Sequence, residues 1–528
     1  MKSVQNEPGE SPACLRLHTE HEDRLYWVCW LDEVIQTSNT VCSGRNACMS
    51  LSSSWSAPPP QARAHLVGIC GAGMKALAEF LFDSGWSVSG CDGDPDPASL
   101  HSLTRLGIDI QKGHSAAHLD GNPDLLIYSP AVNRENVDRA AAAGRGVQQI
   151  SYVDALSQLS RRHQTVGIAG THGKSTTTAM LGQILKTAGR PASVLCGGES
   201  VSAGRSGWAG SSDTLILEAC EFRQHFLELS LRIGCLLGIE ADHFDCYPTL
   251  PDAERAYQQF VRKILREKHT EALGEAPRHH LPRTLIVRSD CSVTSRILQE
   301  ETGRITTFSL QDSTADWQAV QRRRMAGRLH FRIQRKAAVS EEISLAIPGL
   351  HNVQNALAAA ACAEELGVSL QDIARGLREF SGLRRRFEIR GQWRGAVVVD
   401  DYAHHPTEIR ATLTAAREHF PKKKLICLFQ PHQLSRTEAL LAEFAAALSL
   451  ADKIYLLPVY AARENSGFRQ IELSRDLVQR ITIPASLISA LDRVWGTVQT
   501  DADTDAVLLT LGAGSLSRIH YEDFERTE

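Results

Sequence analysis

The sequence predicts an α/β protein of three domains in which mostly parallel sheets are covered by helices. A chain of 528 residues is long enough for about three domains of ordinary size. Short apolar strands, among them Lys424–Phe429 and Ala506–Leu511, alternate with helical stretches such as Thr437–Leu448 from residue 65 onward, the pattern of parallel sheets. A strand, a Gly-rich turn and a helix follow one another twice. We therefore expect an extension followed by three domains, at residues 1–63, 64–160, 161–383 and 384–528.

The amino-acid composition and the net charge argue against several classes of protein. The formal net charge of −4 indicates neither a nucleic-acid partner nor binding to an anionic membrane. No run approaches the length of a membrane span, and the N-terminus lacks the pattern of a secretory signal, so no membrane insertion is expected. The 13 cysteines are scattered and never form C-x-x-C, which favours a reduced cytoplasmic protein over a disulfide framework or a zinc site. We expect a monomer or homodimer.

Residues 1–63 differ from the rest of the chain. They hold three of the eight tryptophans, show no sustained periodicity and end in a Ser- and Pro-rich stretch typical of linkers. We expect a poorly ordered extension, with a small docking segment as the alternative.

The first Gly-rich turn follows the apolar stretch His-Leu-Val-Gly-Ile-Cys. It reads Gly71-Ala-Gly73-Met-Lys-Ala76, and Asp92 lies about twenty positions further on at the end of the next strand. Gly-x-Gly-x-x-Ala with such an acidic residue is the Rossmann fingerprint. Alone, this pattern equally permits an NAD-dependent oxidoreductase with Asp92 on a ribose hydroxyl.

The second turn has the features of a phosphate-binding loop. Its glycines let backbone N–H groups face an anion, Lys174 can reach terminal phosphates, and Ser175 can bind Mg²⁺. Ile168 stands where the strict Walker spacing has Gly, so the loop is shortened. The candidate ATP-binding residues of this turn are Gly170, Thr171, His172, Gly173, Lys174, Ser175 and Thr176.

The shortened loop, Gly-Thr-His-Gly-Lys-Ser, resembles that of the Mur ligase family, whose members join amino acids to a UDP-linked sugar acid in peptidoglycan precursor synthesis. The resemblance covers roughly residues 64–515 and includes signatures in all three domains, in the right order. It implies a Rossmann-like UDP-binding domain, a central P-loop ATPase-like domain and a Rossmann-like amino-acid-binding domain. It also implies ATP, Mg²⁺ and small-molecule substrates.

In the first domain, the resemblance places the substrate's UDP on the Gly-rich turn. Cys70 stands where the family usually has Gly, and Gly113-His114 matches a further short signature. A serine after a strand is more often a turn former than a ligand, so Ser129 from the second loop is a supporting match only. The implied UDP-sugar-binding residues are Gly71, Ala72, Gly73, Met74, Asp92 and Ser129.

Candidate metal ligands lie at the ends of two predicted strands. Glu218 ends one strand and His243 follows another, so both would emerge at the sheet edge that carries the phosphate-binding loop. The resemblance of Glu-Ala-Cys-Glu and Glu-Ala-Asp-His-Phe-Asp to family signatures implies Ser175, Glu218 and His243 as Mg²⁺ ligands. Without the resemblance, we would interpret His243 as an ordinary polar loop residue, because Mg²⁺ prefers oxygen ligands. Gly238 replaces the usual Asn nearby.

Two further segments complete the implied ATP site. His351, Asn352 and Asn355 begin a helix that resembles the family's adenine-side helix, although Asn near a helix start is also a common cap. Arg384-Arg385-Arg386 resembles the hinge into the last domain, and we select Arg386 as the arginine that reaches the phosphates.

The last domain carries Val-Val-Asp-Asp-Tyr-Ala-His-His-Pro-Thr-Glu-Ile and a Pro-His-x-x-x-Arg segment. By resemblance, the residues that receive the amino acid and the muramoyl carboxylate are Asp401, Tyr402, His404, His405, His432 and Arg436. Gln433 replaces the usual Arg and Ser515 replaces the usual Asp.

The reaction implied is the ATP-dependent joining of L-alanine to the lactyl carboxylate of UDP-N-acetylmuramate through an acyl phosphate. The implied catalytic residues are Lys174, His243, Arg386, His404 and Arg436. Three alternatives stay open: a ligase that adds a recycled tripeptide to the same sugar acid, an NAD-dependent oxidoreductase and a non-catalytic paralogue.

Overall fold

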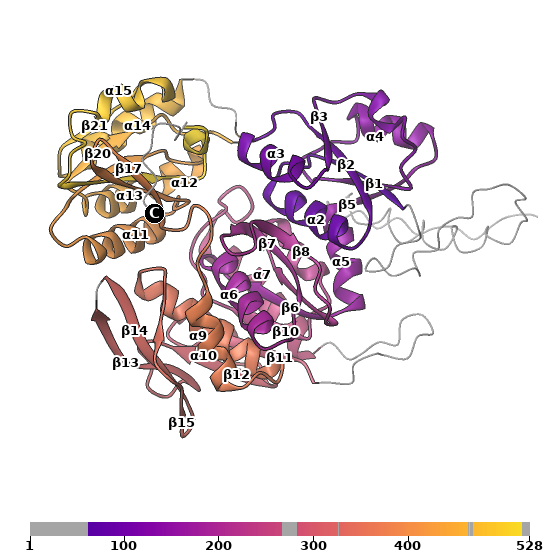
Figure 1. Ribbon diagram of the computed structural model, residues 1–528, viewed down its shortest axis with the longest axis horizontal. Helices are drawn as coiled ribbons and strands as arrows, with labels where there is room; N and C mark the ends of the chain where they lie inside the picture. Colours follow the sequence, from indigo (N-terminus) through magenta and orange to yellow (C-terminus); the bar gives the residue numbers. More distant parts are fainter. Residues whose placement is uncertain (1–61, 267–281, 326, 463, 465–467, 520–528) are drawn as a thin grey trace, which may run out of the picture. The chain divides into compact units, whose positions relative to one another are not determined.

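A computed structural model describes residues 62–519 except 267–281, 326, 463 and 465–467 (Figure 1). The extension expected at residues 1–63 therefore lies almost wholly outside the described residues. The described chain forms three sheets, and each is mostly parallel as predicted. The cysteines in the described part of the chain form no disulfide bond.

The first sheet has five parallel strands in the order β3-β2-β1-β4-β5. The order reverses beside β1, so the loops after β1 and β4 meet at a switch point of the kind where α/β sheets bind ligands. A capping box between Ser151 and Asp154 begins α5. The elements are β1 Arg63–Val67, α2 Ala72–Asp83, β2 Ser87–Asp92, α3 Pro97–Thr104, β3 Asp109–Lys112, η1 Ala116–Leu119, β4 Leu125–Tyr128, α4 Val137–Gly144, β5 Gln148–Ser151 and α5 Tyr152–Arg162.

The second sheet has eleven strands, and β6 lies between β9 and β10. All three run parallel, so their carboxyl ends share one edge. An antiparallel extension, β13 to β16, completes the sheet. The strands are β6 Gln164–Ala169, β7 Ser193–Ser200, β8 Arg205–Trp208, β9 Thr214–Glu218, β10 Ile233–Leu236, β11 Thr284–Arg288, β12 Ile305–Ser309, β13 Trp317–Met325, β14 Arg328–Arg335, β15 Ala338–Val339 and β16 Ile343–Ser344.

Buried helices cover this second sheet. The Ala-rich α9 is buried along most of its length and packs against α6. Gly376 of α10 allows close approach, because a Cβ there would lie 2.6 Å from the Cα of Ile184 in α6. The helices are α6 Lys174–Thr187, η2 Phe222–Glu228, α7 Leu250–Arg266, α8 Ser292–Leu298, α9 Leu350–Glu365 and α10 Leu370–Glu379.

The third sheet has the order β17-β18-β22-β19-β20-β21, with only β17 antiparallel. The helix expected over residues 437–448 is two helices, because Leu440 leaves the helical region at φ −115°. The elements are β17 Glu388–Trp393, β18 Ala396–Asp401, α11 Pro406–His419, β19 Lys424–Phe429, α12 Leu434–Ala439, α13 Leu441–Leu448, β20 Lys453–Leu456, α14 Arg469–Arg480, β21 Ala485–Leu487, η3 Leu491–Arg493, α15 Val494–Val498, β22 Ala506–Leu511 and η4 Ser515–Arg518.

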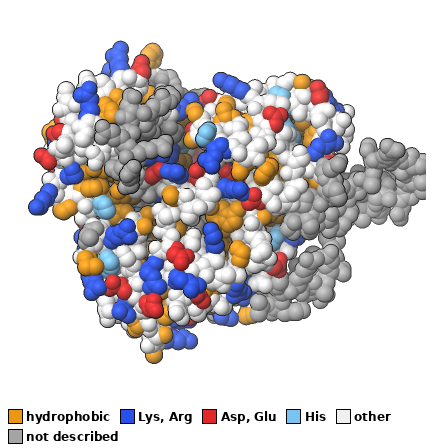
Figure 2. Space-filling model, viewed as in Figure 1, with side chains coloured by type: hydrophobic (Ala, Val, Ile, Leu, Met, Phe, Trp, Pro, Cys, Tyr) orange, Lys and Arg blue, Asp and Glu red, His pale blue; other side chains and the backbone are white. Residues whose placement is uncertain are grey.

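The surface agrees with the small net charge. On the face shown in Figure 2, basic and acidic side chains are interspersed. Among the described helices, none combines the length and the apolar composition that crossing a bilayer requires.

Candidate active site

The phosphate-binding loop joins β6 to α6 through two glycines in left-handed conformations, Gly170 at φ +122° and Gly173 at φ +86°. At Gly173 a Cβ would lie 2.4 Å from Oδ1 of Asn355, so no larger residue fits without movement. Thr171 N–H donates to the carbonyl of Gly238 at 2.9 Å, which ties the loop to the segment after β10. The first turn of α6 thus opens onto the shared edge of the sheet.

Lys174 is held at the centre of this loop. Its Nζ donates to the Gly170 carbonyl at 2.6 Å and to the two carboxylate oxygens of Glu221 at 2.9 and 3.0 Å. Burial alone would lower the pKa of Lys174, but the Glu221 carboxylate outweighs burial and raises the pKa above its usual value. The ammonium is therefore a fixed positive charge. Glu221 was not among the predicted site residues, although it ends the string Glu-Ala-Cys-Glu.

Two of the three predicted metal ligands, Glu218 and His243, lie near the Lys174–Glu221 pair. Glu218 ends β9 and accepts a hydrogen bond from Gly197 N–H. His243 has a left-handed backbone, and its Nε2 lies 3.5 Å from Oε1 of Glu221. Its Nδ1 is buried and has no hydrogen-bond partner among the described residues. A carboxylate, the Ser175 hydroxyl and an imidazole with an unused nitrogen fit a Mg²⁺ ion held together with phosphate oxygens.

The predicted adenine-side helix contacts the loop through Asn355 rather than Asn352. Asn352 donates from Nδ2 to the Pro348 carbonyl at 2.6 Å and accepts from Asn355 Nδ2 at 3.2 Å. Asn352 is thus engaged at the start of α9, in the manner of a local structural role. Asn355 directs its Oδ1 toward Gly173.

His172 of the loop contacts the last domain. Its Nδ1 lies 3.2 Å from Oε1 of Glu408 in α11, and its Nε2 lies 3.6 Å from Oε2 of Glu240. The ring also stands 4.7 Å from that of His405. Burial would lower the pKa of His172, but the two carboxylates raise it to about 10. A protonated His172 therefore joins the ATP-side loop to α11.

Arg386 approaches the same carboxylate. Its guanidinium lies 3.8 Å from Oε1 of Glu408 and 5.1 Å from the centre of the Tyr402 ring. Burial would lower the pKa of Arg386, but Glu408 and Asp401 keep it raised. The structure thus places this predicted phosphate-binding arginine beside α11, close to His172.

Arg436 is buried and paired with a residue of the central domain. Its Nε donates to Oδ1 of Asp242 at 2.7 Å, and NH1 donates to the His432 carbonyl at 3.2 Å. Burial would raise the pKa of Asp242, but Arg436 holds it well below its usual value. Asp242 directly precedes His243, so one short segment contacts both Lys174's partner Glu221 and the last domain.

The two adjacent histidines have different surroundings. His404 Nδ1 lies 3.0 Å from the Tyr402 carbonyl, and burial lowers its pKa to about 4, so the imidazole is neutral. His405 is the N-cap of α11: its Nδ1 accepts from Thr407 N–H, and its Nε2 donates to the Ala241 carbonyl at 3.2 Å. Both nitrogens of His405 are therefore used in structure.

Asp401 is likewise engaged by the backbone. Its two oxygens accept from Phe387 N–H at 2.9 Å and Ala403 N–H at 2.8 Å. Burial raises the pKa of Asp401 to about 6, although Arg386 opposes the shift. These contacts shape the hinge at the end of β18.

At the switch point of the first domain, Asp92 closes the Gly-rich turn. Its Oδ2 accepts from Cys70 N–H at 3.0 Å and its Oδ1 accepts from Asp94 N–H at 3.1 Å. Ser129 meets the same turn, since a Cβ at Gly68 would lie 3.0 Å from its own Cβ. The Asp92 carboxylate therefore holds the backbone of the turn in place, and these two contacts do not distinguish a nucleotide sugar from a dinucleotide.

Three family models match consecutive parts of the chain. The Mur ligase family catalytic domain matches residues 63–164, the Mur ligase middle domain matches 168–363, and the Mur ligase glutamate ligase domain matches 385–514. The chain belongs to the Mur ligase family. The predicted family and its three-domain α/β fold are thereby confirmed.

The names of similar proteins show which members of the Mur ligase family this chain resembles. The chain is 33% identical to a UDP-N-acetylmuramate–L-alanine ligase of Clostridium acetobutylicum, over 86% of this chain and 96% of the relative. It is 39% identical to the ligase of that name from Chlorobium phaeovibrioides, over 76% and 82%. A solved UDP-N-acetylmuramate-alanine ligase from Thermotoga maritima aligns at a TM-score of 0.70 and 28% identity, covering 86% and 97%. A murein peptide ligase from Psychrobacter arcticus aligns at 0.66 and 25%, covering 88% and 98%.

In this Mur ligase, sequence reasoning missed the carboxylates that organise the site. Glu240 and Asp242 lie within the quoted string before His243, and Glu408 lies three residues after His405. The spacing of His405 and Glu408 is that of a capping box, which the structure confirms. That pattern predicts a helix start but does not predict that Glu408 also pairs with His172.

Proposed function

We propose that this Mur ligase joins L-alanine to the lactyl carboxylate of UDP-N-acetylmuramate at the expense of ATP, the first amino-acid addition of peptidoglycan precursor synthesis. The observation that carries the proposal is the segment from Glu240 to His243, which contacts both the Lys174–Glu221 pair and the buried Arg436 of the last domain. Relatives that bear this activity in their names match most of the chain.

ATP would be held by the phosphate-binding loop, with its terminal phosphate at Lys174. Mg²⁺, when bound through Ser175, Glu218 and His243, would neutralise phosphate charge and align it. The fixed ammonium of Lys174 stabilises the charge that develops when the sugar-acid carboxylate attacks the γ-phosphorus. The bond from that phosphorus to the ADP oxygen breaks, and an acyl phosphate and ADP result.

The second step needs a neutral amine. The amine of L-alanine attacks the acyl carbonyl, the amide bond forms, and inorganic phosphate leaves. We assign His404 as the proton acceptor from its position and tautomer: its Nδ1 is engaged with the Tyr402 carbonyl, which leaves Nε2 as the acceptor. The tautomer of His404 is assigned from this hydrogen bond: Nδ1 carries the proton and Nε2 is the basic nitrogen. Burial lowers the pKa of His404 to about 4, which keeps the ring neutral and makes it a weak base.

Contacts across the central and last domains would protect the acyl phosphate from water. The pairs His172–Glu408 and Asp242–Arg436 hold α11 and α12 against the central domain. Exclusion of water from a reactive intermediate is a known role of such closure. We place the enzyme in the cytoplasm, where its proposed nucleotide substrates are found.

A ligase that adds a tripeptide to the same sugar acid is the second candidate, favoured by the likeness to the Psychrobacter arcticus murein peptide ligase. Phosphate release with UDP-N-acetylmuramate separates the two. We expect release with free L-alanine and little with the tripeptide, and we expect none from Lys174→Ala with either. Release with the tripeptide alone would replace our proposal by the second candidate.

A further inference from the structure

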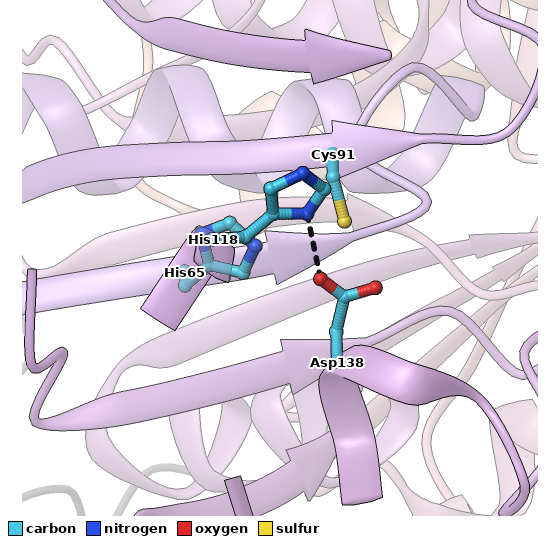
Figure 3. A group of neighbouring side chains, drawn as sticks. All are labelled: His65, Cys91, His118 and Asp138. Carbon is cyan, nitrogen blue, oxygen red and sulfur yellow. Dashed lines mark hydrogen bonds and ion pairs between the residues drawn. The ribbon is translucent and has the colours of Figure 1, made fainter. Parts of the chain in front are cut away.

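Four side chains capable of binding a metal converge inside the first domain. His65 comes from β1, Cys91 from β2, His118 from η1 and Asp138 from α4. Each offers one ligand atom, and the four atoms all lie within 4.8 Å of one another (Figure 3). His65, Cys91 and Asp138 are fully or almost fully buried, and His118 is partly buried. We name these four residues the His-Cys-His-Asp cluster.

One nitrogen of the cluster lacks a partner. His65 Nδ1 pairs with the Ser89 hydroxyl at 3.0 Å, while Nε2 is buried and has no hydrogen-bond partner among the described residues. A buried nitrogen without a partner is unfavourable, and a cation bound at Nε2 would satisfy it when Nδ1 carries the proton and donates to Ser89.

Asp138 connects the other members. Its Oδ1 lies 2.7 Å from His118 Nδ1, and its Oδ2 lies 2.9 Å from Nδ1 of His114. Cys91 Sγ lies 3.6 Å from the same His114 nitrogen. A cation binds a cysteine as the thiolate, so binding at this cluster would release the thiol proton.

We propose that the His-Cys-His-Asp cluster is a structural Zn²⁺ site of the first domain. One sulfur, two imidazole nitrogens and one carboxylate suit a tetrahedral, thiophilic cation and not Mg²⁺, which demands oxygen. In a tetrahedral site with zinc–ligand bonds of about 2.0–2.3 Å, the ligand atoms stand about 3.3–3.8 Å apart, so the most widely separated atoms of the cluster would approach one another by about 1 Å on binding. Four protein ligands leave no open position, the arrangement of structural sites.

Such a site would stabilise the region of the predicted UDP-sugar site. The four ligands come from two adjacent strands and two separate helical segments, which the cation would cross-link. Asp138 Oδ2 stays bonded to His114, which belongs to the Gly113-His114 match, so the cation would also orient that ring. This role is independent of the ATP-side centre.

The test is Co²⁺ titration of the full-length protein after treatment with a chelator. We expect one tightly bound Co²⁺ with a thiolate-to-cobalt charge-transfer band and intense visible bands of a tetrahedral ion. Cys91→Ser should abolish the charge-transfer band. The matched control Cys427→Ser, which alters another fully buried strand cysteine, should keep it. Dependence on Cys91 separates this site from any cation bound by Glu218 and His243.

If Cys91→Ser does not fold, two further measurements still test the proposal. Zn²⁺ should raise the unfolding midpoint of the chelator-treated wild-type protein, and His65→Gln should lower Co²⁺ affinity by at least about tenfold. A wild-type protein without the charge-transfer band would overturn the proposal, as would a band that survives in Cys91→Ser. Either result would mark the cluster as a hydrogen-bonded network only.

Discussion

Arg436 of α12 donates to Asp242 at 2.7 Å, and Asp242 is the residue before His243. The contact joins the last domain to a loop whose next side chain lies 3.5 Å from Glu221, the partner of Lys174. The contact therefore places the last domain one peptide unit away from the predicted metal ligand His243. The resemblance implies Arg436 as a substrate-binding residue, and in the structure its guanidinium forms a buried ion pair with Asp242.

Removing the carboxylate of this pair should impair catalysis strongly. In Asp242→Asn, Arg436 loses its partner while only 2% of its side chain is exposed. Breaking a buried pair costs about 3–5 kcal/mol, which corresponds to a loss of about 10²–10³-fold or more in kcat/KM if the closed arrangement bears the cost. Steady-state phosphate release measures the loss. Arg469→Gln, at an exposed pair, is the control and should change little. Wild-type kinetics in Asp242→Asn would contradict the coupling.

Glu221 should matter through both the position and the charge of Lys174. In Glu221→Gln the pKa of Lys174 falls, because burial then opposes the ammonium without the carboxylate that outweighs it. Loss of a charge-assisted hydrogen bond of about 1.5–3 kcal/mol predicts a kcat about 10–100-fold lower. Lys174→Ala should release no phosphate, and the exposed Glu300→Gln should behave as wild type. The pH–rate profile of Glu221→Gln should lose activity at a lower pH than that of the wild type, and an unchanged profile would contradict this explanation.

Local pattern predicted much of the fold. Strands β19 and β22 were predicted with their observed bounds, because each is a buried apolar run bounded by polar residues. Leu440 shows the limit: an apolar residue in a helical pattern gives no sign that its φ of −115° will separate α12 from α13. The break is decided by packing, which local periodicity does not contain.

Contacts between side chains that are far apart in the sequence could not be predicted in the same way. His172 and Glu408 are more than two hundred residues apart, and nothing in either local string indicates that they meet. The His-Cys-His-Asp cluster is a stronger case, because its residues come singly from four elements and the absence of C-x-x-C pointed away from zinc. Only the tertiary arrangement of two strands and two helical segments brings them together.

The charged His172 should make stability depend on pH. Its pKa is raised from 6.5 to about 10 in the folded protein, so the stabilisation is fully present below pH 6.5 and is lost as pH rises through 10. The facing groups are Glu240, Glu408 and His405. The difference in unfolding midpoint between wild type and His172→Gln should therefore shrink from pH 6 to pH 10. The exposed His101→Gln should show no such trend. A constant difference would refute the pairing.

Gly173 should tolerate no side chain, for two separable reasons. Its φ of +86° is strained for other residues, and a Cβ would lie 2.4 Å from Oδ1 of Asn355. Gly189, at φ +72° with no atom within 4 Å of an added Cβ, offers the matched control because Gly189→Ala carries the backbone strain alone. We expect Gly189→Ala to cost about 1 kcal/mol of unfolding free energy and Gly173→Ala to cost more.

The comparison extends to activity. Gly173→Ala should also abolish phosphate release, because the shifted turn misdirects the backbone N–H groups that face the phosphates, whereas Gly189→Ala should retain it. Adding Asn355→Ala to Gly173→Ala removes the clash but not the strain, so stability should return to about the level of Gly189→Ala. If the double variant is no more stable than Gly173→Ala, then backbone conformation alone selects glycine here, and Asn355 does not define the shape of the loop.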